Sequence, residues 1–225
     1  MFALQPRTSD LTTLYGEKEA LYFSTTRIEL IELINRRDLR VLEIGCGAGV
    51  TGNRLLETGK AKWITGIEMV SAYAEAARSI FNEVLIGNIE DMEFDWKDGE
   101  FDCFVFGDVL EHLSDPWGLL RRLRPLLADN GIVVASIPNI KHWPVLANLI
   151  FHDDWKYAES GILDITHLRF FTKKSAIRLF STHGYLVEII QPYFNGRRYS
   201  IPNKVTAGAF SGFLAERWLM RLNAA

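Results

Sequence analysis

The feature that most constrains this chain is the segment VLEIGCGAG at residues 41–49. It begins with a short run dominated by apolar residues, which is typical of a buried strand. Gly45, Gly47 and Gly49 follow at once and permit a tight turn whose backbone can approach a ligand closely. A helix is predicted directly after the turn, at about residues 50–58. A strand, a glycine turn and a helix in this order are typical of a parallel α/β sheet that binds a ligand at the carboxyl end of the strand.

The same alternation of strand and helix continues along the chain. Apolar runs predict further strands at about residues 63–68, 83–86, 102–106 and 131–137, and helical periodicity predicts helices at about 24–36, 71–80 and 116–127. We interpret Asn130-Gly131 as the signal that ends the last of these helices. This order predicts an α/β fold with a doubly wound parallel sheet and helices on both faces.

The later part of the chain is less regular. Residues 139–168 read as a long insertion without a clear period, after which Thr172 is predicted to cap a helix that runs to His183. A strand is expected at 185–190. From Pro202 to the end the sequence predicts one more amphipathic helix, with its apolar stripe formed by Phe210, Leu214, Trp218 and Leu222. Core packing is the favoured role for that stripe, and an oligomer or membrane contact is the alternative.

We find no internal repeat and no low-complexity tract, so residues 1–225 are expected to form one domain. We divide it into four parts by the patterns above. These are an N-terminal helical cap (1–37), a cofactor-binding core (38–137), an acceptor-site insertion (138–170), and C-terminal helices and strands (171–225).

Composition narrows the class of protein. A net charge of -3 argues against a general nucleic-acid binder, which needs an excess of Lys and Arg to neutralise phosphates. Cys46 and Cys103 belong to no CxxC pair and are expected to be free thiols in a reducing compartment. The start of the chain lacks the pattern of a secretory signal, and no apolar run reaches the roughly 18 residues of a transmembrane helix. We therefore expect a cytoplasmic protein without a membrane span.

The residues around the glycines indicate the charge of the ligand. Val50 stands where a dinucleotide-binding loop prefers Gly or Ala, and no Lys or Arg lies between Val41 and Asn53 to hold a phosphate. Glu43, just before the turn, suits a cation better than a pyrophosphate. S-adenosylmethionine fits this chemistry, because it carries a sulfonium and an ammonium and has no phosphate.

Two later strand ends offer further contacts to such a ligand. Glu68 ends the second predicted strand, where a carboxylate can accept hydrogen bonds from both ribose hydroxyls. Asn88 and Ile89 follow the third strand, where Asn88 could accept from the exocyclic amine of adenine and Ile89 could stack on its ring. A plain turn at Asn88 is the alternative.

In this order, VLEIGCGAG, GIE, GNIE and FDCFVFGDVLEHLSDP resemble the motifs of class I S-adenosylmethionine-dependent methyltransferases, over residues 22–190. The strings SIPNIKHW, GILDITHLRFFTKKSA and YFSTTRIELIELI are similar to a bacterial subgroup encoded beside, or fused to, glycosyltransferases of surface-polysaccharide pathways. The resemblance implies a Rossmann-like seven-stranded sheet of order 3-2-1-4-5-7-6. It also implies S-adenosylmethionine as cofactor, S-adenosylhomocysteine as product, and a small-molecule or glycan- or lipid-linked acceptor, with a glycosyltransferase of the same pathway as a partner.

We expect the cofactor to contact Glu43, Gly45, Cys46, Gly47, Gly49, Glu68, Met69, Asn88, Ile89, Asp108 and Val109. The family usually has Asp where this chain has Asn88, so the contact to adenine is expected to lose a charge there. The predicted function is methyl transfer to oxygen or nitrogen of the acceptor. The alternatives are a non-catalytic S-adenosylmethionine-binding regulatory module and a nicotinamide-dependent Rossmann enzyme, which Val50 disfavours.

A hydroxyl acceptor must lose its proton, and His112 and His167 are the predicted bases. His112 follows the fourth strand, and His167 lies in the insertion, which we expect to cover the site with aromatic residues such as Trp143. Asp108-x-x-Glu111-His112 also resembles the acidic cluster of metal-dependent small-RNA 3′-end methyltransferases and ubiquinone-pathway O-methyltransferases. We assign no metal ligand, and a metal-dependent O-methyltransferase is kept as an alternative.

Overall fold

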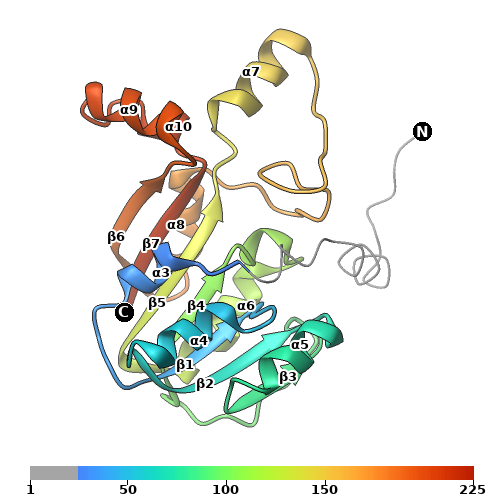
Figure 1. The fold of residues 1–225 in the computed structure, drawn as a ribbon, viewed down its shortest axis with the longest axis vertical. Helices are drawn as coiled ribbons and strands as arrows, with labels where there is room; N and C mark the ends of the chain where they lie inside the picture. Colours follow the sequence, from blue (N-terminus) through green and yellow to red (C-terminus); the bar gives the residue numbers. More distant parts are fainter. Residues whose placement is uncertain (1–24) are drawn as a thin grey trace.

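The computed structural model describes residues 25–225, so the predicted N-terminal cap is seen only from residue 25 onward. Its sheet has seven strands in the order β3-β2-β1-β4-β5-β7-β6, which confirms the predicted order (Figure 1). The strands are β1 (Leu39–Ile44), β2 (Ala61–Glu68), β3 (Glu83–Ile86), β4 (Phe101–Gly107), β5 (Leu127–Pro138), β6 (Tyr185–Tyr193) and β7 (Arg217–Ala224). The first five are parallel, whereas β7 runs antiparallel to both β5 and β6.

Helices cover both faces of the sheet, as predicted. The α-helices are α3 (Ile28–Leu33), α4 (Val50–Glu57), α5 (Ser71–Arg78), α6 (Pro116–Leu123), α7 (Trp143–His152), α8 (Lys173–Ser181), α9 (Arg197–Val205) and α10 (Ser211–Leu214). Alternate residues of each strand point to opposite faces. Val41 of β1 therefore packs with α3, α4 and α5, and its neighbour Leu42 packs with α6 and α8. Each face of the sheet thus has its own buried apolar layer.

The glycine segment folds as predicted. Strand β1 is almost wholly buried, and Gly45, Gly47 and Gly49 all have positive φ, at 66°, 54° and 82°. Such backbone is accessible to glycine without the strain that a Cβ would bring. Gly49 is the N-cap of α4, which begins at Val50. The predicted cap of α8 is also confirmed, because the Thr172 side chain accepts from the backbone N–H of Ser175 in a capping box.

The predicted C-terminal amphipathic helix is wrong. Phe210 and Leu214 lie at the start and end of the short α10 segment, whereas Trp218 and Leu222 lie on strand β7 and are buried. Strand β7 is inserted between β5 and β6, so it pairs on both edges and is covered on both faces. An inner strand of this kind is apolar on both faces and cannot be told from a buried helix by periodicity alone.

The helices differ from the predictions in three further respects. Helix α6 ends at Leu123, because Pro125 follows in a short 3-10 turn (η2, Arg124–Leu126), and Asn130-Gly131 then lies inside β5. The N-terminal helix is limited to Ile28–Leu33. The insertion is not irregular throughout, since it begins with the ten-residue helix α7. In the described part of the chain, no helix is long and apolar enough to cross a membrane.

Candidate active site

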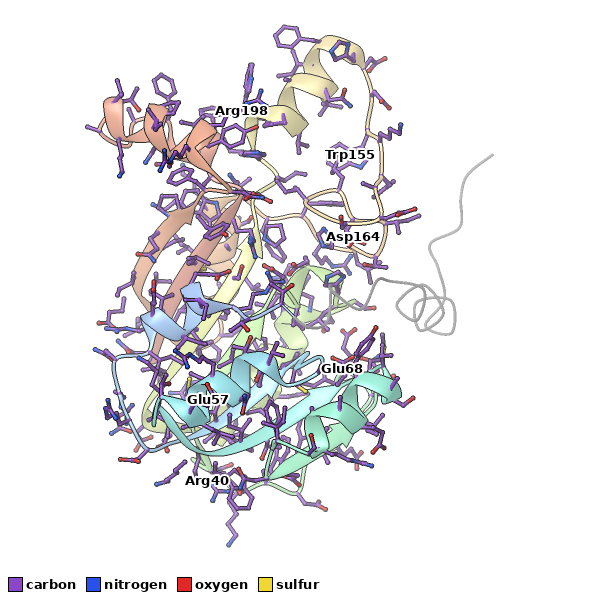
Figure 2. The ribbon with its side chains drawn as sticks, in the orientation of Figure 1. Arg40, Glu57, Glu68, Trp155, Asp164 and Arg198 are labelled. Carbon is purple, nitrogen blue, oxygen red and sulfur yellow. The ribbon has the colours of Figure 1, made fainter. Side chains whose placement is uncertain are left out.

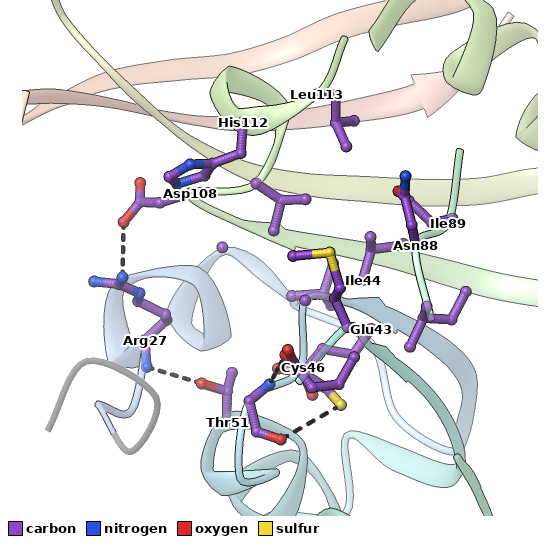
Figure 3. A pocket seen from close by; sticks show the side chains of 18 of the residues that line it. Arg27, Glu43, Ile44, Cys46, Thr51, Asn88, Ile89, Asp108, His112 and Leu113 are labelled. Carbon is purple, nitrogen blue, oxygen red and sulfur yellow. Dashed lines mark hydrogen bonds and ion pairs between the residues drawn. The ribbon is translucent and has the colours of Figure 1, made fainter. Parts of the chain in front are cut away.

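A pocket opens at the carboxyl ends of β1, β2 and β4, bounded by the glycine turn and the turn after β3 (Figure 3). Ten of the eleven predicted cofactor contacts line it: Glu43, Gly45, Cys46, Gly47, Glu68, Met69, Asn88, Ile89, Asp108 and Val109. Gly49 does not. A Cβ at Gly49 would lie 3.2 Å from both Ala77 and Phe81, so this glycine instead permits close packing of α4 against α5 and the segment that follows it.

The Glu68 carboxylate is held by the backbone on both sides of the pocket floor. Its Oε2 accepts from the Gly47 N–H at 2.9 Å, and its Oε1 accepts from the Val70 N–H at 2.9 Å. Burial raises the pKa of Glu68, and these backbone donors oppose that rise. Each carboxylate oxygen can accept more than one hydrogen bond. Glu68 is therefore oriented in advance and keeps acceptor capacity for a pair of hydroxyls.

Glu43 is a second buried carboxylate in the wall of the pocket. Its side chain is 5% exposed, and Oε2 has no hydrogen-bond partner among residues 25–225. Burial raises its pKa to about 8, and the nearby charge of Glu68 adds to the rise, whereas the Gly52 backbone lowers it. A cation bound nearby would favour the ionised form of this group.

Cys46 and Asn88 line the pocket, and each also has a structural role. The Cys46 thiol is buried, and a Cβ at Gly66 would lie 2.8 Å from its sulfur, so the side chain packs against β2. Asn88 Oδ1 accepts from the Glu90 N–H at 3.1 Å, and its Nδ2 donates to Asp91 at 3.0 Å. The amide thus closes the turn after β3. This is the structural role predicted from the sequence as the alternative to binding adenine.

Asp108 is engaged by two arginines that the sequence patterns did not single out. Its carboxylate pairs with Arg27 at 2.9 Å and with Arg217 at 2.8 Å, and Ser136 donates to it as well. Burial would raise the pKa of Asp108, but the two guanidinium groups outweigh burial and hold it below its usual value. Asp108 has a φ of 57°, so its backbone turns sharply at the end of β4. Asp108 therefore does not join Glu111 and His112 in one cluster.

Glu111 instead meets the two predicted bases. One side-chain ligand atom from each of Glu111, His112 and His167 lies within 4.8 Å of the others, and the imidazole centroids are 4.6 Å apart. Glu111 is 1% exposed, and neither of its carboxylate oxygens has a hydrogen-bond partner among the described residues. Burial and the neighbouring Asp108 charge hold its pKa well above the usual range. The structure thus brings together two residues that are more than fifty positions apart.

The loop after α7 orients both imidazoles. His112 Nδ1 lies 3.1 Å from Thr166 Oγ1 and 3.2 Å from the Thr166 carbonyl oxygen. Thr166 Oγ1 donates its own hydrogen to the buried Asp164 at 2.7 Å, so it serves as an acceptor toward His112. His167 Nδ1 likewise faces the Ile162 carbonyl oxygen at 2.9 Å. Both rings therefore carry their proton on Nδ1 when neutral, and Nε2 is the nitrogen that can accept a proton or bind a metal.

A second pocket adjoins the first on the side of this loop. It is lined by residues of the loop, among them Gly161, Asp164 and His167, and by Glu111 and Arg217. Thr25, Arg27, Asp108 and His112 line both pockets. His112 thus stands where the two meet. Asp164 and Thr166, like Arg27 and Arg217, were not predicted; the only sequence signal for the first two is their place in the string DITH beside His167.

The aromatic residues of the insertion do not gather at these pockets. Trp143 and Tyr157 are 46% and 48% exposed and line neither pocket, and His142 packs against Tyr199 with ring centroids 4.8 Å apart. Trp155 contacts the ring of Phe170 at 5.3 Å, and Figure 2 shows it in the loop above Asp164. Apart from Pro138 at its start, the insertion reaches the second pocket only with its later part, around 160–167.

Comparison with known proteins adds to this geometry. A family model described as "Methyltransferase domain" matches residues 17–188. The chain is 30% identical over 112 residues to a ubiquinone biosynthesis O-methyltransferase of Neisseria meningitidis, covering 46% of this chain and 45% of that protein. It is also 30% identical over 118 residues to the protein of the same name from Histophilus somni, covering 48% and 49%. The chain thus matches about half the length of these relatives.

Solved structures share the whole fold at low identity. A putative S-adenosylmethionine-dependent methyltransferase from Listeria monocytogenes superposes with a TM-score of 0.64 at 15% identity, over 92% of this chain and 100% of that one. A structure from Mesorhizobium loti, titled an S-adenosylmethionine-dependent methyltransferase, gives a TM-score of 0.61 at 13% identity, over 93% and 99%.

Proposed function

This chain belongs to the methyltransferase-domain family, and from that premise we propose that it transfers the methyl group of S-adenosylmethionine to a hydroxyl oxygen of an acceptor held in the second pocket. The observation that carries the proposal is the place of His112, which lines both pockets. A base at this border can reach an acceptor hydroxyl that faces the methyl group. Oxygen is favoured over nitrogen because the curated relatives are named O-methyltransferases.

The first pocket has the groups that the cofactor requires. S-adenosylmethionine supplies a methyl group bonded to a cationic sulfur, which makes that carbon electrophilic. Glu68, fixed by the Gly47 and Val70 amides, would accept from the ribose hydroxyls. Glu43 would face the cationic end, and the orphaned Oε2 of its buried carboxylate supports that role. Gly45 and Gly47, with positive φ, would let the backbone approach the ligand.

The groups that line the second pocket suit a hydroxyl acceptor. His112 Nε2 would take the proton of the acceptor hydroxyl, because Nδ1 is already committed to Thr166. His167, whose ring centroid lies 4.6 Å from that of His112, would contact the acceptor in the same pocket. Much of the rate would come from alignment, since methyl transfer requires the oxygen, carbon and sulfur in line. The loop at 160–167 would contribute to that alignment, because it holds both imidazoles.

The test measures formation of S-adenosylhomocysteine with four acceptor probes: a catechol, a monophenol, an aliphatic sugar alcohol and a primary amine. We expect turnover with a hydroxyl probe, and its loss in His112→Asn while S-adenosylhomocysteine still binds. His183→Asn, in the turn after α8, is the matched control. Turnover with the amine alone would contradict the proposed oxygen acceptor, and full activity of His112→Asn would exclude it as the base.

A metal-assisted version of the same transfer is the second candidate. Glu111 and the imidazoles of His112 and His167 fit a divalent cation, because neither oxygen of the buried carboxylate has a hydrogen-bond partner among residues 25–225 and each Nδ1 faces an oxygen of the protein. One carboxylate and two imidazoles suit a transition metal. Such an ion would lower the pKa of a bound acceptor hydroxyl.

Metal binding has a readout that is independent of activity. We expect Mn²⁺, Co²⁺ or Zn²⁺ to raise the melting temperature of the wild-type protein and not that of Glu111→Gln. Glu57→Gln, on the exposed surface of α4, should respond as the wild type does. Identical melting responses of wild type and Glu111→Gln would rule out a site at these three residues.

The subgroup resemblance extends the proposal to the source of the acceptor. Strings such as SIPNIKHW favour a glycan- or lipid-linked hydroxyl, supplied by a glycosyltransferase of the same pathway. Mass spectrometry of surface glycans from a deletion strain would show the loss of one O-methyl group on this view. An unchanged glycan profile, together with loss of a methylated small molecule, would point to a free acceptor.

A further inference from the structure

Helix α7 is apolar and stands apart from the core. Its sequence is WPVLANLIFH, yet none of its residues is buried. Ile150 and Phe151 are 64% and 68% exposed, and Trp143 and Leu149 are exposed as well. Figure 1 shows α7 beyond the carboxyl end of β5, away from the sheet. The middle of the helix, residues 145–148, is partly buried, whereas the four apolar side chains named above face outward, where the surface of a protein is usually polar.

The α9–α10 segment combines exposed apolar side chains with a one-sided charge. Ile201, Val205, Phe210 and Phe213 are all exposed, Val205 to 80%. Between Glu188 and Glu216 the sequence contains no acidic residue, while Arg197, Arg198 and Lys204 are all exposed. The segment therefore has a charge of +3 in a chain whose net charge is -3. Among the described residues, none of these three cations forms an ion pair with a carboxylate.

Both elements belong to one end of the molecule. The base of α7 is joined to the α9–α10 segment, because Asn139 Nδ2 donates to the carbonyl oxygens of Gly212 and Ala215. Lys141 also lies over the Phe213 ring at 4.2 Å. Figure 2 shows Arg198 on α9 at the same end as α7. We name α7, α9 and α10 together the basic–apolar surface.

We propose that the basic–apolar surface binds the surface of an anionic phospholipid bilayer. Exposed Ile, Phe and Val side chains can enter the boundary between headgroups and acyl chains, while adjacent Arg and Lys contact the phosphates. Their long stems let the cations remain at headgroup level beside inserted apolar groups. A second copy of the chain is disfavoured, because a two-fold contact through this surface would place the same unpaired cations against each other.

The test is sedimentation of the full chain with vesicles, without cofactor or acceptor. We expect binding to vesicles of phosphatidylglycerol mixed with phosphatidylcholine, and little binding to phosphatidylcholine alone. The double variant Arg197→Glu/Lys204→Glu should lower the partition coefficient at least ~20-fold. The reason is that each basic residue near an anionic surface raises the partition coefficient several-fold. Ile201→Ser/Val205→Ser should reduce binding as well, because both side chains are exposed and their loss leaves the core intact.

The matched control is Lys62→Glu/Lys97→Glu, which makes the same change in charge at the opposite end of the sheet. Both lysines are exposed, Lys62 near the start of β2 and Lys97 before β4. This control should lower the partition coefficient by less than about two-fold, because salt screens charges that lie far from the bilayer surface. The proposal would be overturned if both charge variants lost vesicle binding equally, or if the wild type bound neutral and anionic vesicles equally. It would also be overturned if light scattering showed a stable dimer that Ile201→Ser/Val205→Ser dissociates.

Discussion

Glu68 is the residue on which the assignment of the cofactor pocket depends most directly. We expect Glu68→Ala to weaken the binding of S-adenosylhomocysteine by about 1.5–3 kcal/mol, through loss of charge-assisted hydrogen bonds to the ribose. Calorimetry well below the melting temperature measures this, because the variant also leaves the Gly47 and Val70 amides without their acceptor. Glu57→Ala, on the exposed side of α4, is the control. Unchanged affinity in Glu68→Ala would place the ribose elsewhere.

Glu43 makes the stability of the ligand-free protein depend on pH. Its folded pKa of about 8 exceeds the ordinary 4.5, so between these values the folded state binds more protons than the unfolded state. The contribution of Glu43 to the free energy of unfolding is therefore fully present at low pH, and it is lost as the pH rises through about 8. The unfolding free energy of the wild type should fall between pH 5 and 8. We expect that fall to be smaller by on the order of 3 kcal/mol in Glu43→Gln, which has no carboxyl group to titrate. Urea denaturation at both pH values measures the difference, and parallel curves for the two proteins would contradict it.

At the scale of elements, the loop after α7 positions the proposed base, His112, which belongs to a different element. The 3-10 turn η1 (Leu110–His112) holds His112, and the Glu111 carbonyl oxygen accepts from the Leu168 and Arg169 amides, which fixes the loop against it. Thr166 then links His112 to Asp164. The loop is thus part of the geometry of the site, even where its side chains line no pocket.

This arrangement makes Thr166 a positioning residue. We expect Thr166→Val to lower kcat by about 10- to 100-fold with little change in cofactor affinity, because the imidazole loses one of its two oxygen partners. Thr166→Ser should restore kcat, since it returns the hydroxyl. Thr182→Val, at the exposed end of α8, is the control. A loss of kcat that Ser does not rescue, or one accompanied by an equal loss of folded protein, would show a structural role only.

At the scale of the whole molecule, Arg221 joins parts of the chain that are distant in sequence. It lies on β7, its guanidinium donates to Glu188 of β6 at 2.8 Å, and it donates to the Leu33 carbonyl oxygen of α3 at 3.1 Å. We expect Arg221→Met to lower the free energy of unfolding by about 1–3 kcal/mol, because the buried carbonyl loses a charged donor. Cofactor affinity should not change. Arg54→Met, whose partner Glu57 is exposed, should cost less than about 0.5 kcal/mol.

Much of the fold could be predicted because its signals are local. The apolar run of β1, the three glycines and the start of α4 are adjacent in sequence, so turn chemistry and periodicity specify them without reference to the rest of the chain. The capping box of Thr172 and Ser175 is local in the same way. Glu68 and Ile89 could be placed in the pocket because parallel strands end at one edge of the sheet.

The remaining features are contacts between residues far apart in sequence. No local pattern distinguishes Arg217 from other cations, and its pairing with Asp108 exists only because β7 enters the sheet beside β5. The position of β7 between β5 and β6 also explains why the predicted terminal helix is a strand. Pairing on both edges outweighs the helical spacing of Trp218 and Leu222. His112 and His167 could each be nominated as a base from the sequence. That they meet at Glu111, with Thr166 orienting one of them, was decided by the tertiary structure, because a loop closed over the end of β4 sets those distances.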